Sequence, residues 1–177
     1  MLDVDQVCKI MLEYIETSLE TPHSLFAELP ICPFVRVARL KHKLDLWVHP
    51  FDPSTEIDVS VQQKIEEFCL AQKDVLLVIH PNPIAMNFAA LNRFVERLND
   101  SIDALGLVAF GGHPDDPFEV NGVQTRHDPF INFTIQRQQK LTTARKSLLQ
   151  THYYQAWNGD ALEAVGIEEM VRSAQTE

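Results

Sequence analysis

Cysteine, basic residues and long apolar runs are all scarce in this chain of 177 residues, and each shortage excludes a class of protein. The cysteines, Cys8, Cys32 and Cys69, are odd in number and match no zinc-finger spacing, so a disulfide framework is not expected. No apolar run approaches the roughly 20 residues that span a bilayer. The first residues are acidic and amphipathic, unlike a secretory leader. We therefore expect a cytoplasmic protein with free thiols and no membrane contact.

The charge balance excludes a further class. Lys and Arg number 15 against 25 Asp and Glu, so the formal net charge is −10. A protein that binds nucleic acid needs clustered basic side chains to neutralise phosphates, and this composition disfavours such a surface. A protein partner with a basic patch is compatible with the charge.

The chain has an ordinary globular composition, with 45% hydrophobic and 23% charged residues. Its length suits one domain over residues 1–177 with a sizeable core. An N-terminal helix is expected over residues 3–20, with Asp3 or Asp5 as its cap, and C-terminal helices over about 138–174. Strands are expected near residues 43–49, 75–80, 107–110 and 131–135, the last as a strand or a short extended lead-in.

Helical spacing also separates the first three expected strands. One helix ends near Ala71, and Thr55 with Asp58 fits a capping box at its start. A second helix follows over residues 88–102. Because strands joined by helices of this length normally run parallel, the sequence predicts an α/β fold with a small, mainly parallel sheet and flanking helices.

Each of these three strands ends in the same dipeptide, His-Pro, at His49, His80 and His113. The carboxyl ends of parallel strands meet at one edge of a sheet, where ligand sites collect. Imidazole and carboxylate groups are ligands for divalent metals such as zinc. The sequence therefore predicts a metal or small-ligand site in which His80, His113 and Asp115 are the candidate metal ligands, with His49 nearby.

The segment 111–130 carries further candidate groups. Asp115 or Asp116 could serve as a general base beside His113. Arg126 could clamp a carboxylate or phosphate. The candidate substrate-binding residues are Arg126, His127 and Phe118.

Cys32 lies in the stretch Ile-Cys-Pro-Phe and has two interpretations. It is either a small buried hydrophobe or a thiolate nucleophile. In the second case it joins His113, Asp115 and Asp116 as a candidate catalytic residue.

Two functions are compatible with these patterns. The first is a metal or small-ligand site at the carboxyl edge of the sheet, as in a metal-dependent hydrolase-like enzyme. The second is a non-catalytic interaction or assembly protein that uses the 111–130 loop as a docking surface. Aromatic residues would then anchor the partner, namely Phe118, Phe130, Tyr153, Tyr154 and Trp157.

Several of these motifs, in this order, resemble the bacterial family catalogued as domain of unknown function 1415. The motifs are Cys32-Pro33-Phe34 after the first helix, His80-Pro81 after a Leu-rich strand, and His113-Pro114-Asp115 followed by Phe118 and then by Arg126 with Pro129. The resemblance covers roughly residues 11–154. It implies where a site lies and implies no particular reaction.

Overall fold

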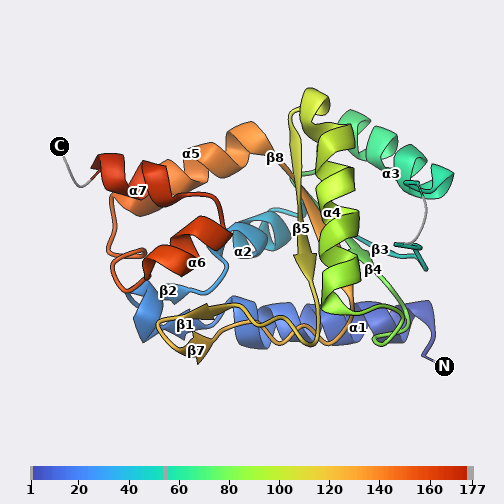
Figure 1. Cartoon of the computed structure of the whole chain (residues 1–177). Helices are drawn as coiled ribbons and strands as arrows, with labels where there is room; N and C mark the ends of the chain where they lie inside the picture. The colour runs from blue at the N-terminus through green and yellow to red at the C-terminus, as the bar shows by residue number, and fades with distance from the viewer. Residues whose placement is uncertain (1, 54–55, 175–177) are drawn as a thin grey trace.

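A four-stranded mixed sheet forms the centre of the computed structural model, which describes residues 2–53 and 56–174 (Figure 1). The strands are β3 (Leu44–Val48), β4 (Val75–Ile79), β5 (Leu107–Gly112) and β8 (Asn132–Arg137), in the spatial order β3-β4-β8-β5. β3 and β4 are parallel, whereas β8 is antiparallel to both of its neighbours. The α/β class is confirmed, but the prediction of a mainly parallel sheet is wrong.

The reversal follows from the path of the chain between β5 and β8. Residues 113–131 run along the edge at which β5 ends, so β8 starts at that edge and must run back across the sheet. β4 and β5 are both antiparallel to β8, and β3 is parallel to β4, so β3, β4 and β5 run in one common direction. The carboxyl ends of these three strands therefore share one edge, as the His-Pro pattern predicted, although β8 separates β5 from β4.

Helices surround this sheet on both faces. In chain order they are α1 (Val4–Tyr14), α2 (Pro33–Leu40), α3 (Val59–Leu70), α4 (Phe88–Ile102), α5 (Gln138–Leu149), α6 (Gly159–Ala164) and α7 (Glu168–Ala174). Shorter turns are η1 (Ile15–Leu19), η2 (Ser24–Phe26) and η3 (Asp103–Leu105). All helices of the described residues are too short or too polar to span a bilayer.

The N-terminal helix begins as expected. Asp3 caps α1 and forms a capping box with Gln6, and η1 extends the helical segment to Leu19. At α3 the cap is Asp58, while Thr55 lies outside the described residues. The short helix α2 was not predicted, because three prolines in its neighbourhood obscure it; Pro33 occupies the first turn, where a missing N–H is harmless.

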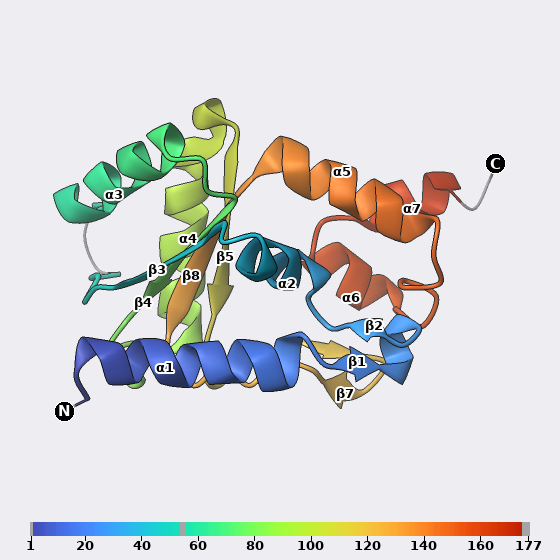
Figure 2. The same ribbon diagram turned by 180° about the vertical axis from the view of Figure 1, so that it is seen from behind.

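Alternate side chains of β4 pack on opposite faces of the sheet. Leu76 and Val78 join the core beneath α3 and α4, whereas Leu77 and Ile79 join the core beneath α1 and α2. Figures 1 and 2 show these two helix layers from opposite sides. All five residues of β4 are therefore buried, which explains the continuous apolar run in its sequence.

The C-terminal helices lie beside the sheet rather than on it, as both views show (Figures 1 and 2). They share a third core cluster with Phe26, Val120 and Tyr153. Two small hairpins complete this side, β1 (Pro22–His23) with β2 (Leu29–Pro30), and β6 (Glu119–Val120) with β7 (Val123–Gln124). The segment 113–131 is thus an ordered connection.

Candidate functional site

His113 is buried, and both of its ring nitrogens already contact backbone groups. Only 2% of the residue is exposed. Nδ1 accepts a hydrogen bond from the Asp115 N–H at 2.9 Å, and Nε2 lies 2.9 Å from the Met86 carbonyl oxygen, to which it donates in the matching tautomer. The ring therefore connects the β5 end to the segment before α4 and has no nitrogen lone pair directed at open space.

His80 and His49 lie next to each other at the ends of β4 and β3, as predicted, yet each has its own partners. Burial lowers the pKa of His80, whose Nδ1 accepts the Asn82 N–H at 3.0 Å. His49 stacks on Trp47 with ring centroids 4.2 Å apart, and its Nε2 lies 2.7 Å from Asp58 Oδ2. The start of β8 separates both rings from His113, since the His80 N–H donates to the Ile131 carbonyl.

The structure does not bring the expected metal ligands together. Asp115 points outward, with 88% of its side chain exposed, and its Oδ2 is 3.9 Å from His113 Nδ1. Within residues 2–53 and 56–174, no group of three or more His, Cys, Asp or Glu side chains has the arrangement to hold a metal ion.

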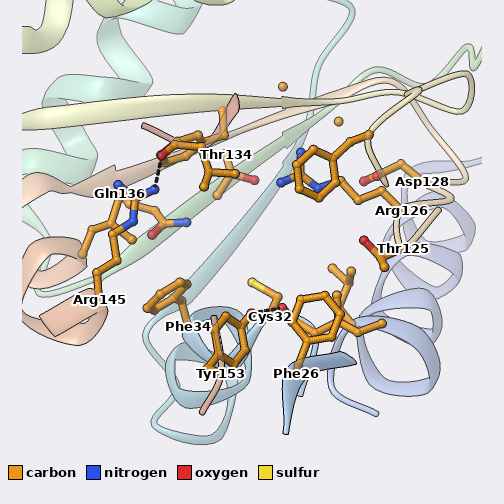
Figure 3. A pocket seen from close by; sticks show the side chains of 18 of the residues that line it. Phe26, Cys32, Phe34, Thr125, Arg126, Asp128, Thr134, Gln136, Arg145 and Tyr153 are labelled. Carbon is orange, nitrogen blue, oxygen red and sulfur yellow. Dashed lines mark hydrogen bonds between the residues drawn. The ribbon is translucent and has the colours of Figure 1, made fainter. Parts of the chain in front are cut away.

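A pocket lies against one face of β5 and β8 and reaches the edge of the sheet where β5 ends (Figure 3). Its floor consists of Phe110, Thr134 and Gln136, which point to the face covered elsewhere by α1 and α2. Phe34 of α2 and Tyr153 lie on the opposite wall. The cavity volume is about 180 Å³, enough for a small organic molecule.

Arg126 and Phe118 both line this pocket, so two of the candidate substrate-binding residues meet there. The guanidinium carbon of Arg126 lies 4.0 Å from the centroid of the Phe118 ring. Asp116 is only 3% exposed and holds both residues: its Oδ2 is 3.5 Å from Arg126 Nη1, and its Oδ1 accepts the Phe118 N–H at 2.9 Å. Asp116 therefore positions the arginine, whereas His127, the third candidate, is an exposed residue.

A hydrogen-bonded group around Asp128 closes the end of the pocket nearest the strand edge. Asn132 Nδ2 donates to Asp128 Oδ1 at 2.8 Å, and the Tyr14 hydroxyl donates to Oδ2 at 3.4 Å. Burial raises the pKa of the Asp128 carboxyl. Gly112 makes this arrangement possible, because a Cβ there would lie 2.6 Å from both Asp128 Oδ1 and Asn132 Nδ2.

Cys32 lines the pocket from the first turn of α2, where it is the N-cap residue. Burial raises the pKa of its thiol, and the charge of Asp128 acts in the same direction. The amides of Val35 and Phe34 and the Arg126 guanidinium oppose this and favour the thiolate. Of the candidate catalytic residues, Cys32 is the one that lines the pocket, whereas His113, Asp115 and Asp116 do not.

Arg145 of α5 was not a candidate in the sequence, yet it lines the far end of the pocket (Figure 3). Its Nη2 donates to the Val165 carbonyl at 2.9 Å, and its guanidinium carbon lies 5.8 Å from the centroid of Phe110. Burial lowers its pKa. None of the carboxylates that the structure describes forms a salt bridge with it.

Two buried polar atoms in the pocket wall have no hydrogen-bond partner among the described residues. They are Thr125 Oγ1 and Trp157 Nε1. Such atoms are uncommon in folded proteins, because burying a polar atom without a partner is costly. An indole N–H is a donor only, and a hydroxyl can also donate, so both atoms match a ligand that accepts hydrogen bonds.

The aromatic residues expected as docking anchors are turned inward instead. Phe130 is 4% exposed, Tyr153 3% and Tyr154 8%, while Phe118 and Trp157 are half-buried against the third core cluster. Tyr153 also donates a hydrogen bond to the Ile31 carbonyl. Phe130 packs in the core beneath α1 and α2, whereas the other four rings pack with the C-terminal helices and form a wall of the pocket.

Arg145 and Thr125 were missed because they belong to no motif, and Trp157 was a candidate only as a docking anchor. The only signal in the sequence was that Arg145 occupies a mostly polar helix four residues after Leu141, which is buried and also lines the pocket.

No family model, no curated protein and no solved structure matches the chain.

Proposed function

We propose that this protein binds a small organic acid in the pocket between β5, β8 and the C-terminal segment, with the acid group at Arg145. The observation that carries this proposal is the half-buried guanidinium of Arg145, which forms no salt bridge with any carboxylate among residues 2–53 and 56–174. A buried charge without a counter-ion is costly, and a bound carboxylate or phosphate would compensate it.

The other lining groups describe the rest of the ligand. Thr125 and Trp157 have hydrogen-bonding atoms without partners, so the ligand carries acceptor atoms. Aromatic rings make up much of the wall, among them Phe26, Phe34 and Phe110. Pockets of this kind hold an apolar or planar body and fix its orientation through a few polar groups.

Membership of the family catalogued as domain of unknown function 1415 is part of this proposal. Four motif residues of the resemblance, Cys32, Phe34, Phe118 and Arg126, line the same pocket. Parts of the first and last motifs, which are distant in the sequence, thus lie together, whereas His80 and His113 do not line the pocket. A divalent metal at His80, His113 and Asp115 finds less support, because backbone groups engage the ring nitrogens of His113.

The fluorescence of Trp157 offers a direct binding assay. The chain has two tryptophans, and the Trp47→Phe variant leaves Trp157 as the only reporter. Benzoate, glutarate and phenyl phosphate are suitable probes. We expect at least one to change the emission saturably, and Arg145→Met to raise its Kd about 10- to 100-fold, the effect of losing a charge-assisted hydrogen bond.

The control is Arg93→Met, which removes an exposed arginine from α4, outside the pocket. Its Kd should equal that of the parent. If none of the probes binds, or if Arg145→Met binds as tightly as Arg93→Met, the acid group does not lie at Arg145.

A further inference from the structure

Of the three cysteines, Cys32 alone lines the pocket. Cys8 lies on α1, and Cys69 lies on α3 and packs against the core on the opposite face of the sheet. In Figure 3 the Cys32 sulfur lies near Phe34 and Tyr153, and Arg126 lies on the opposite wall of the pocket. A bound ligand would therefore contact one thiol of the protein.

A second observation indicates a ligand at this end of the pocket. Thr125 is only 7% exposed, and its Oγ1 has no partner among the described residues. Thr125 and Arg126 line the same pocket as Cys32, and the charge of Arg126 acts on the Cys32 thiol, so a hydroxyl and a guanidinium lie on the wall across from the sulfur. A pair of donors beside a thiol is the arrangement that stabilises a developing oxyanion.

We propose that Cys32 is a catalytic nucleophile that takes the acyl group from a small acid-bearing ester or thioester in this pocket. The inference rests on the proposed function, since Arg145 would hold the free acid group while the acyl carbonyl lies at the opposite end. Arg126 and Thr125 bind the carbonyl oxygen. The substrate class is therefore a half-ester or half-thioester of a small diacid.

The reaction balances with the groups present and water. The Cys32 sulfur attacks the acyl carbon while its proton passes to the Asp128 carboxylate, and the carbonyl oxygen becomes an oxyanion. The bond from the acyl carbon to the leaving oxygen or sulfur then breaks, and the leaving group takes the proton from Asp128. Water next attacks the acyl-cysteine, gives a proton to Asp128, and releases the diacid as the thiol regains that proton.

The surroundings of Cys32 and Asp128 agree with these roles. Because burial raises the pKa of the thiol, the resting sulfur keeps its proton and a base is needed. Burial also raises the pKa of Asp128, which makes its carboxylate a better proton acceptor than an exposed one. Arg126 favours the thiolate once it forms.

The test uses mono-4-nitrophenyl glutarate as the probe and the full chain carrying Cys8→Ser and Cys69→Ser. We expect release of 4-nitrophenolate together with a glutaryl adduct on Cys32, found by intact mass and peptide mapping. Adding Cys32→Ser should abolish the adduct while glutarate still binds in the Trp157 assay. Asp128→Asn should slow acylation on the order of 100-fold, the usual effect of losing a general base.

Neutral 4-nitrophenyl acetate separates catalysis from simple thiol reactivity. The acetate ester should acylate Cys32 much more slowly than the glutarate ester. Arg145→Met should raise the half-saturating concentration of the glutarate ester and leave the reaction of the acetate ester unchanged. Equal rates for the two esters, or an adduct that survives Cys32→Ser, would overturn the proposal. If glutarate binds and no adduct forms, Cys32 is not the nucleophile although the acid site stands; if glutarate does not bind either, the acid site itself is wrong.

Discussion

At the scale of single residues, the imidazole of His113 acts as a cross-link between two backbone segments. It bonds to a carbonyl before α4 and to an amide after β5, and the Phe88 ring lies edge-on to it with a centroid distance of 6.0 Å. Such a buried ring stabilises the fold through contacts that no other residue type reproduces.

We expect His113→Ala to lower the free energy of unfolding by about 2–4 kcal/mol, because it leaves a cavity and two buried backbone groups without partners. Urea denaturation would measure the loss. The matched control, His127→Ala at an exposed position, should change stability by less than about 0.5 kcal/mol. A stable His113→Ala protein that loses a bound divalent metal would instead favour the metal site.

Residue patterns predicted part of the pocket. Arg126 and Phe118 were candidates because they lie in the segment 111–130 with its His and Asp residues, and Cys32 was a candidate because it lies in the stretch Ile-Cys-Pro-Phe. Arg145 gave no such signal, since a lone arginine on a helix is normally solvated, and its orientation depends on how the C-terminal helices pack. His80 and His113 stood out in the sequence as strand-end residues, and in the structure each ring accepts a hydrogen bond from the backbone N–H two residues further along the chain.

At the scale of elements, the start of α3 joins a helix cap to a neighbouring strand. Asp58 Oδ1 accepts the N–H groups of Ser60 and Val61, while its Oδ2 contacts His49 at the end of β3. Burial alone would raise the pKa of Asp58, but the His49 contact and the two amides outweigh it and hold the pKa below its ordinary value. One carboxylate thus fixes both the helix and the strand end.

Asp58→Ala should lower the free energy of unfolding at pH 7 by about 1–2 kcal/mol through loss of the cap. Asp58→Asn should cost less, because asparagine caps a helix about as well and only the charge is lost. A folded pKa below the unfolded value of about 3.9 means that the stabilisation is present above that pH and is lost as pH falls through the folded pKa. Stability measured between pH 7 and 2 should therefore fall less steeply on the acid side in both variants, and parallel acid limbs would contradict this role of the carboxylate.

The order of the strands shows where sequence patterns reach their limit. The alternation of Ile131, Phe133 and Ile135 predicted a strand, but alternation carries no information about which neighbours the strand pairs with. β8 occupies the centre because Phe133 and Ile135 complete the core under α3 and α4. Thr134 and Gln136, on its other face, are polar because they form the floor of a pocket.

At the scale of the whole molecule, a pocket that contains two arginines lies within a strongly acidic protein. The formal net charge is −10, whereas Arg126 and Arg145 both line the pocket in which we propose that an acidic ligand binds. The net negative charge of the protein would therefore repel the proposed ligand, while the two arginines would attract it. The Debye length falls from about 30 Å at 0.01 M salt to about 8 Å at 0.15 M, so salt screens the distant repulsion more than the buried contact.

We expect the association rate constant of the acidic probe to rise about 2- to 10-fold between 0.01 and 0.15 M salt, while the dissociation rate changes little. Stopped-flow fluorescence of Trp157 in the Trp47→Phe background would measure both rates. A neutral amide analogue of the same probe, which the field does not repel, should show no salt dependence. An association rate that falls with salt would mean that the arginines dominate the field at the entrance.

The central place of β8 also sets the order in which the chain can fold. β3 and β4 can pair once residue 79 has left the ribosome, but β5 pairs with β8 alone and must wait for residues 132–137. Translation adds about 5–20 residues per second, so β5 emerges seconds before its partner and leaves β4 with one open edge. During that interval the nascent protein exposes its most apolar strand, and a chaperone that shields β4 until β8 inserts would improve its yield.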